Sequence, residues 1–187
     1  MPSFDPRALG QLTGTAVSTV AYRNQAKGFD PRSGDGARRL GGRFNPPHSF
    51  PVLYLCLTRP CVVAELTRQA ERQRLDVEAL LPRELFEIRA DLDKVLDLTD
   101  TETLDALGIV PPDLVRADHG FTQGIGEAAH EHAFQAIRSP SATGVHNVLA
   151  IFPEELAGAV LDVKLLGEWS TADDLGGLSR RDPGPGP

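Results

Sequence analysis

The pattern of apolar and polar positions along the chain predicts a mixture of strands and helices. Residues 15–23 are rich in β-branched side chains, and residues 51–57 form a continuous apolar run, so both segments predict strands. Residues 85–98 alternate between apolar and polar side chains, as one or two strands do. Residues 145–152 and 157–166 predict the strands that close the sheet.

Three other segments have the period of a helix. In residues 61–73 the apolar side chains recur at the spacing of one helical face, and Arg68 and Arg72 lie on the opposite face. Residues 121–137 predict a second long helix. Residues 99–109 predict a short helix, because a Thr/Asp pair at its start is typical of a helix cap.

Two segments lack a regular period. Residues 24–50 are interrupted by glycine and proline throughout, which predicts a long loop, and loops of this length in a compact domain are usually functional or disordered. The clustered glycines and cations favour a functional loop. From residue 170 the composition becomes polar, which predicts a flexible tail over residues 170–187 and a folded domain over residues 1–169. Strands and helices without strict alternation predict the α+β class: a single domain with a mixed, partly antiparallel sheet and packed helices.

Charge and composition narrow the classes of function. The 187 residues are 41% hydrophobic and 24% charged, as in an ordinary globular domain. The net charge of −7 argues against a general binder of nucleic acid or membrane surfaces. Residues 1–50 nevertheless carry seven Lys and Arg against three Asp, a local excess that suits a small anionic ligand. There is no secretory signal and no apolar run near the roughly 20 residues of a membrane helix, so we expect a cytoplasmic protein.

The strongest chemical signal lies in residues 34–47, GDGARRLGGRFNPP. Its glycines allow the backbone to approach a ligand closely, and successive N–H groups in such turns bind anions. Arg38, Arg39 and Arg43 add guanidinium groups that match phosphate oxygens two at a time. Neither a P-loop nor a dinucleotide-binding fingerprint is present. The residues alone therefore leave two interpretations open, an anion-binding loop and a solvated surface loop.

No metal site is predicted. Cys56 and Cys61 are the only cysteines and are expected to be small buried side chains. His130 and His132 are two positions apart, so on a helix they point in different directions and cannot form a zinc pair. His119 lies in a turn, where it could contact a ligand or simply face solvent.

Five short motifs, in order along the chain, resemble those of the RES-domain family. They are AYR (21–23), GARRLGGRFNPP (36–47), PVLYL (51–55), AEL (64–66) and PSA (140–142). Members of this family are the toxins of bacterial toxin–antitoxin pairs whose partner is an Xre-type protein. The resemblance implies a fold similar to that of ADP-ribosyltransferase toxins, and NAD+ as a substrate rather than a cofactor. The sequence GDGARR is similar to the one found in the branch of the family that phosphorolyses NAD+. This similarity implies inorganic phosphate as co-substrate.

The resemblance also assigns site residues. The family's arginines, tyrosine and helix acid fall on Arg23, Arg43, Tyr54 and Glu65. The family's serine falls on Ser139 or Ser141, and we expect Ser141, which directly follows the proline. The resemblance implies an antitoxin that covers the basic cleft, with no direct contact to nucleic acid.

The chemistry implied by the resemblance explains these residue types. Breaking the nicotinamide N-glycosidic bond builds positive charge on the ribose. A carboxylate such as Glu65 at 4 Å would stabilise that charge by about 4 kcal/mol at an effective dielectric constant near 20, which is roughly a thousandfold in rate. Arg23, Arg39 and Arg43 would hold the diphosphate, and Tyr54 would stack on the nicotinamide ring.

Two other functions remain open on the sequence alone. The same site could transfer ADP-ribose to a protein target. Alternatively, the loop over residues 24–50, which we call the arginine loop, could belong to a non-catalytic module that binds a nucleotide or phosphate. DNA binding is disfavoured, because the chain is acidic and has no basic recognition helix.

Overall fold

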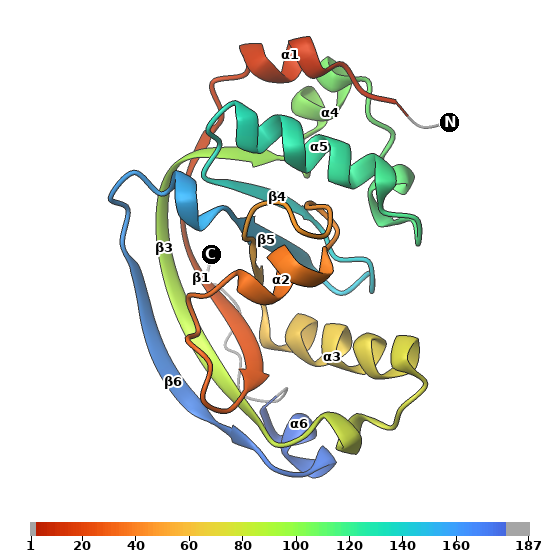
Figure 1. The fold of residues 1–187 in the computed structure, drawn as a ribbon, viewed down its shortest axis with the longest axis vertical. Coiled ribbons are helices and arrows are strands. Elements are labelled where there is room, and N and C mark those ends of the chain that lie inside the picture. Colours follow the sequence, from red (N-terminus) through yellow and green to blue (C-terminus); the bar gives the residue numbers. More distant parts are fainter. Residues whose placement is uncertain (1–2, 179–187) are drawn as a thin grey trace.

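Long and short strands form one sheet in the computed structural model, which describes residues 3–178. The strands are β1 (Thr15–Ala26), β2 (Leu53–Cys56), β3 (Arg83–Asp97), β4 (Ala136–Pro140), β5 (Asn147–Ile151) and β6 (Leu161–Trp169). The long strand β3 lies between β1 and β6 and is antiparallel to both. Figure 1 shows these three strands curving side by side along one edge of the molecule.

The strand order is β1-β2-β5-β4-β3-β6, and β1 pairs in addition with β3. β1 meets β2 where Tyr22 lies opposite Cys56. The short strand β5 lies between β2 and β4 and is antiparallel to both, and β4 runs parallel to the end of β3. β1, β2, β5, β4 and β3 therefore close into a ring, with β6 outside it. The mixed, mostly antiparallel sheet confirms the predicted α+β class.

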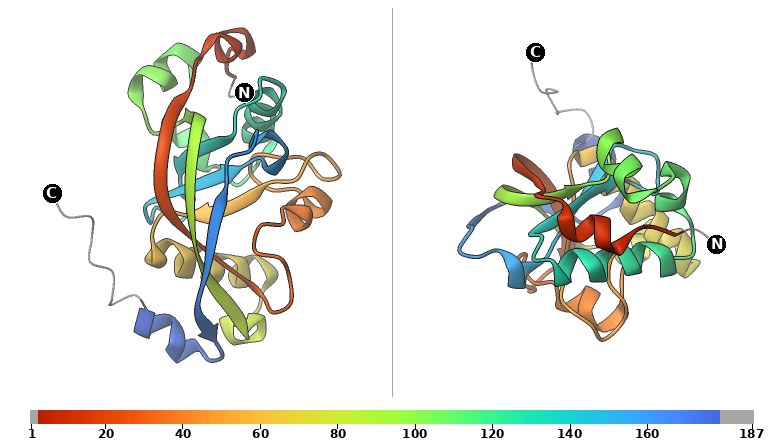
Figure 2. Two further views of the ribbon diagram at one scale, coloured as in Figure 1. Left: turned by 90° about the vertical axis from the view of Figure 1, so that its left-hand side faces the viewer. Right: turned by 90° about the horizontal axis from the view of Figure 1, so that it is seen from above.

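Helices cover both ends of this sheet. They are α1 (Pro6–Gln11), α2 (Asp35–Leu40), α3 (Arg59–Gln73), α4 (Thr101–Leu107), α5 (Gly120–Glu131) and α6 (Ala172–Leu178), with short 3-10 helices at Val77–Leu80, Pro111–Val115 and Pro153–Glu155. Figure 2 shows α1, α4 and α5 at one end of the long strands and α3 and α6 at the other. No helix within residues 3–178 is long and apolar enough to cross a membrane.

The helix that carries the candidate acid is defined at both ends by local chemistry. The Thr58 hydroxyl caps its first turn by accepting a hydrogen bond from the N–H of Cys61 at 3.3 Å. Arg74 ends the helix in the left-handed conformation, with φ 57°. Cys61, Val62, Leu66 and Ala70 face the core, as the apolar period predicts. Cys56 and Cys61 are both free and buried, which confirms their predicted role as small core side chains.

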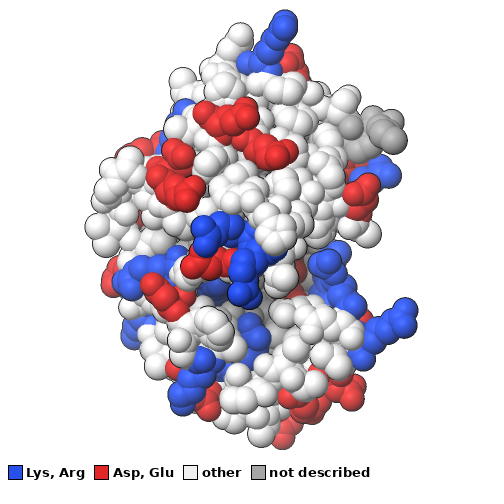
Figure 3. Space-filling view, in the orientation of Figure 1, with Lys and Arg blue, Asp and Glu red and all other residues white. Residues whose placement is uncertain are grey.

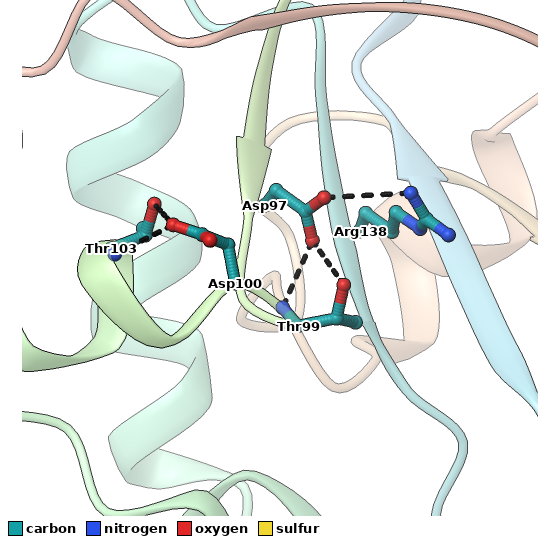
Figure 4. A network of polar contacts seen from close by, with 5 residues as sticks. All are labelled: Asp97, Thr99, Asp100, Thr103 and Arg138. Carbon is teal, nitrogen blue, oxygen red and sulfur yellow. Dashed lines mark hydrogen bonds and ion pairs between the residues drawn. The ribbon is translucent and has the colours of Figure 1, made fainter.

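A polar network joins the end of β3 to β4 and α4 (Figure 4). Asp97 accepts hydrogen bonds from the N–H and hydroxyl of Thr99 and forms an ion pair with Arg138 at 3.4 Å. Asp100 caps α4 by accepting a hydrogen bond from the N–H of Thr103 at 2.8 Å, and this bond lowers the pKa of the Asp100 carboxyl group. The network therefore fixes the point where β3 leaves the sheet.

Three segments differ from their prediction. The predicted helix over residues 121–137 ends at Glu131, because Ala133 adopts a left-handed conformation with φ 52°. The N–H of Gln135 then donates to the carbonyl of Lys94, and the chain continues as β4. Inside the predicted loop, residues 35–40 form α2.

The third difference concerns the predicted flexible tail from residue 170. Residues 172–178 form α6, because the Asp174 carboxylate accepts the N–H groups of Ser170 and Thr171 and Leu175 is buried beside Trp169. The rest of that predicted tail, residues 179–187, lies outside the described residues.

Candidate active site

A cavity of about 690 Å³ lies between α2, α3, α5 and the strands β1 and β2. Four residues predicted from the sequence line it, namely Arg23, Arg43, Tyr54 and Glu65. On the face seen in Figure 3, lysine and arginine side chains gather around α2 and in the hollow between it and α3. The fold therefore brings together residues from β1, the arginine loop, β2 and α3.

Glu65 projects from α3 into this cavity, and a serine far along the chain holds it. The Ser141 hydroxyl donates a hydrogen bond to Oε1 of Glu65 at 2.7 Å. Ser141 is only 1% exposed, and its oxygen accepts from the N–H of Thr143 at 3.1 Å. The Thr143 hydroxyl lies 2.6 Å from the same oxygen. Ser141 therefore orients the carboxylate of Glu65.

The structure separates the two candidate serines. Ser139 is buried in β4, where its hydroxyl contacts the carbonyl of Pro140 at 3.4 Å. Ser141 contacts Glu65 but is not among the residues that line the cavity. Ser141 therefore contacts the cavity through Glu65, and a catalytic role for it, which the family resemblance implies, stays a prediction.

A tight turn presents Arg43. The N–H of Gly42 donates to the carbonyl of Asn45 at 2.9 Å, so Arg43 lies in the middle of the turn. Asn45 is fully buried, and its Nδ2 donates to the carbonyl of Ala37 in α2 at 2.8 Å. Phe44 is also fully buried, which anchors the turn in the core.

Helix α5 supports the same turn from the other side. Gln123 donates from Nε2 to the carbonyl of Gly42 at 3.0 Å. Gly126 lies so close that a Cβ atom there would be 1.7 Å from the carbonyl oxygen of Phe44. Only glycine allows this approach of α5 to the arginine loop.

Arg43 is half-buried, and its side chain has polar partners. Its Nη1 donates to the carbonyl of Leu114 at 2.9 Å. Burial lowers the pKa of Arg43, and the nearby Glu65 opposes that shift. Glu65 and Arg43 are therefore electrostatic neighbours in the lining of the cavity.

Tyr54 holds the turn through its hydroxyl group. That oxygen accepts from the N–H of Phe44 at 2.8 Å and donates to Oδ1 of Asn45 at 2.9 Å. Burial raises the pKa of Tyr54, so the hydroxyl stays protonated. A Cβ at Gly42 would be 2.6 Å from the ring, so the turn packs directly on it. The hydroxyl of Tyr54 is thus satisfied inside the protein, as one interpretation of this apolar segment expects, and stacking on nicotinamide stays a prediction.

Tyr54→Phe should lower the free energy of unfolding by about 1–3 kcal/mol, because the N–H of Phe44 and Oδ1 of Asn45 each lose a buried partner. Urea denaturation followed by circular dichroism measures this change. A midpoint equal to that of the unaltered protein would show that the hydroxyl does not hold the turn.

Arg23 anchors the first part of the arginine loop. Its Nη1 donates to the carbonyls of Pro31 at 3.0 Å and Ser33 at 2.8 Å. Burial, and then the charge of Arg83, lowers the pKa of Arg23 to about 10, so it remains a cation at neutral pH. Arg83 itself donates to the side chain of Asn24.

The structure does not bring Arg39 into the site. It is exposed on α2 and is not among the residues that line the cavity. Its neighbour Arg38 pairs with Asp35 at 2.9 Å. The short helix turns these side chains toward solvent, so the predicted contact of Arg39 with a diphosphate has no support in the cavity geometry.

Sequence reasoning missed several cavity residues. Arg68 and Arg72 were assigned to the solvent face of their helix, yet both line the cavity. They follow Glu65 by three and seven positions, a spacing that places all three on one side of a helix and could have revealed them. Arg83, which was also missed, lines the cavity too. So does His119, for which contact with a ligand was one of the two interpretations of the sequence.

Comparison with known proteins decides the family. The family model of the RES domain matches residues 20–172. This chain belongs to the RES-domain family. The motifs that contain Arg23, Arg43 and Glu65 all lie within the matched range, and these three residues line one cavity.

Curated relatives and a solved structure agree with this assignment. The RES domain is 32% identical over 149 residues to the NAD(+) phosphorylase MbcT of Mycobacterium bovis, covering 79% of this chain and 80% of the relative. The MbcT protein of Mycobacterium tuberculosis matches equally well. The crystal structure of the M. tuberculosis MbcT–MbcA toxin–antitoxin complex matches with a TM-score of 0.79 and 28% identity, over 92% of this chain and 95% of that one.

Proposed function

We propose that this RES-domain protein is a toxin that cleaves the nicotinamide–ribose bond of NAD+ and transfers the ADP-ribosyl group to inorganic phosphate. The observation that carries the proposal is the carboxylate of Glu65, oriented by Ser141 inside a cavity lined by Arg23 and Arg43. The name NAD(+) phosphorylase, borne by relatives that align over most of this chain, supports the same reaction.

Each group in the cavity has a task in this reaction. The bond between the nicotinamide nitrogen and C1 of the ribose breaks, and its electron pair leaves with neutral nicotinamide. Glu65 stabilises the positive charge that develops on the ribose. Arginine side chains hold the diphosphate while the leaving group departs. A phosphate oxygen then bonds to C1 and gives ADP-ribose 1-phosphate; attack by water would give ADP-ribose instead.

The proposal includes a protein partner. A solved relative is a complex of toxin and antitoxin. We infer that an Xre-type antitoxin binds this chain and covers the cavity, where cationic side chains are concentrated in a protein of net charge −7. We infer that the proposed reaction takes place in the cytoplasm, the location expected from the sequence.

Incubation of the purified protein with NAD+, with and without inorganic phosphate, tests the reaction. We expect nicotinamide release that rises with phosphate concentration, together with ADP-ribose 1-phosphate identified by chromatography and mass spectrometry. Release of ADP-ribose at a rate independent of phosphate would identify hydrolysis. ADP-ribose found attached to cellular proteins would favour protein modification, and NAD+ that binds but stays intact would favour a non-catalytic module.

A further inference from the structure

The cavity contains a second group of cations besides those predicted from the sequence. Arg68 and Arg72 extend from α3 on the side of Glu65, and both line the cavity. Arg68 is half-buried, and its buried Nη1 has no hydrogen-bond partner among residues 3–178. An unpaired buried donor on a charged group is costly unless a ligand supplies the acceptor.

These cations act on their neighbours. The charges of Arg68 and Arg72 lower the pKa of Arg43, after the larger effect of burial. They also lower the pKa of His119, again after burial and together with Arg43. A lowered pKa keeps His119 neutral near pH 7, so it borders the cations without adding a charge. We call Arg43, Arg68 and Arg72 the α3 cation cluster. Glu65 is the acid that opposes the shift of Arg43, so the cluster combines several mutually repelling cations with one carboxylate.

Arg23 and Arg83 form a different group in the same cavity. Arg83 lowers the pKa of Arg23, and Asp30 is the acid that opposes it. Their hydrogen bonds run to the carbonyls of Pro31 and Ser33 and to the side chain of Asn24. The cavity thus provides two positions for anions: Glu65 is the acid that raises the pKa of Arg43, whereas Asp30 is the acid that raises the pKa of Arg23. Arg68 and Arg72 share the helix of Glu65 and line the cavity with it.

We propose that the α3 cation cluster binds the attacking inorganic phosphate, while Arg23 and Arg83 bind the diphosphate of NAD+. This inference rests on the proposed phosphorolysis. The attacked carbon lies beside Glu65, because Glu65 stabilises the charge that develops there. The attacking phosphate must therefore lie beside Glu65 as well, and the cluster with an unpaired guanidinium donor is at that place.

The step is balanced without another reactant. The bond between C1 and the nicotinamide nitrogen breaks, and both electrons remain on nicotinamide. A phosphate oxygen supplies the electron pair of the new bond to C1. Any proton left on the phosphate is released to solvent, so no protein base is required. The arginines lower the repulsion between the phosphate and Glu65 as they approach the same carbon.

Steady-state kinetics of Arg68→Gln and Arg72→Gln distinguish the proposed phosphate position from the proposed diphosphate position. We expect each variant to raise the KM for phosphate by about tenfold or more, since each removes a charge-assisted hydrogen bond. The KM for NAD+ should stay within about twofold, and a larger share of the product should be ADP-ribose, because water replaces phosphate. Arg83→Gln should do the opposite, raising the KM for NAD+ with little effect on phosphate.

Arg74→Gln is the matched control. Arg74 follows α3 directly, is exposed and is not among the cavity-lining residues, so this variant removes the same charge without touching the cluster. It should leave both KM values unchanged. If Arg68→Gln and Arg72→Gln instead raise the KM for NAD+ and spare phosphate, the cluster binds the diphosphate and the inference is wrong.

Binding of phosphate alone gives a readout that does not need turnover. Isothermal titration of the unaltered protein with inorganic phosphate, without NAD+, should show binding that is lost in Arg68→Gln and retained in Arg74→Gln. Circular dichroism checks that each variant is folded, and Arg68→Lys, which keeps the charge, should retain part of the affinity. Equal phosphate binding in all variants would overturn the inference, even if nicotinamide is still released. Absence of NAD+ cleavage by the unaltered protein would instead overturn the proposed function.

Discussion

Glu65→Gln should lower the rate of nicotinamide release from NAD+ by about a thousandfold, because the neutral amide cannot stabilise the charge on the ribose. The amide oxygen can still accept the hydrogen bond from Ser141, so the fold and the affinity for NAD+ should change little. Chromatographic assay of nicotinamide, together with a thermal unfolding curve, measures both effects.

The control for this variant is Glu71→Gln. Glu71 lies on the same helix but is exposed and is not among the residues that line the cavity. Its replacement removes one negative charge from α3 and should leave the rate unchanged. If Glu65→Gln turns over NAD+ as fast as Glu71→Gln does, Glu65 has no part in the reaction.

Gly126→Ala should lower the free energy of unfolding by about 3 kcal/mol and nearly abolish activity. The added Cβ would lie 1.7 Å from the carbonyl oxygen of Phe44, so α5 and the arginine loop must move apart. That movement breaks the support given by Gln123 to the turn that presents Arg43. Urea denaturation and the nicotinamide assay measure the two losses.

Gly124→Ala in the same helix provides the comparison. A Cβ at this position would have Phe4 as its nearest neighbour, at an ordinary distance of 3.7 Å. Alanine also favours a helix over glycine by up to about 1 kcal/mol, so this variant should be as stable as the unaltered protein or more stable. Equal stability of the two alanine variants would mean that α5 does not approach the loop as closely as the structure shows.

The elements that depend on side-chain period could be predicted from the sequence, and those that depend on tertiary contacts could not. The apolar face of α3 and the alternation in β3 were sufficient to identify both elements. In contrast, the period of α5 continues through Ala133 and Ala136, so nothing in the pattern marks the place where the helix ends. That place is set by pairing of the following residues with β3 and β5.

The candidate active site likewise combines residues that the sequence could predict with contacts that only the folded chain reveals. Motif resemblance found Arg23, Arg43 and Glu65, which line one cavity. It could not show that Ser141 acts through Glu65, because that contact joins residues 76 positions apart. Arg68 belongs to none of the five motifs, and its place at the cavity follows from its position three residues after Glu65 on α3.

The order of the strands has a consequence for how the protein is made. β2 pairs with β1 only where Tyr22 lies opposite Cys56, and it pairs along its length with β5, which ends at Ile151. Ser141 reaches Glu65 from the connection just before β5. A nascent chain therefore cannot assemble the cavity until β5 has left the ribosome. A chain that terminates before that point carries Glu65 and Arg43 without the complete ring of strands that brings them into one cavity, so we expect it to be inactive in the nicotinamide assay.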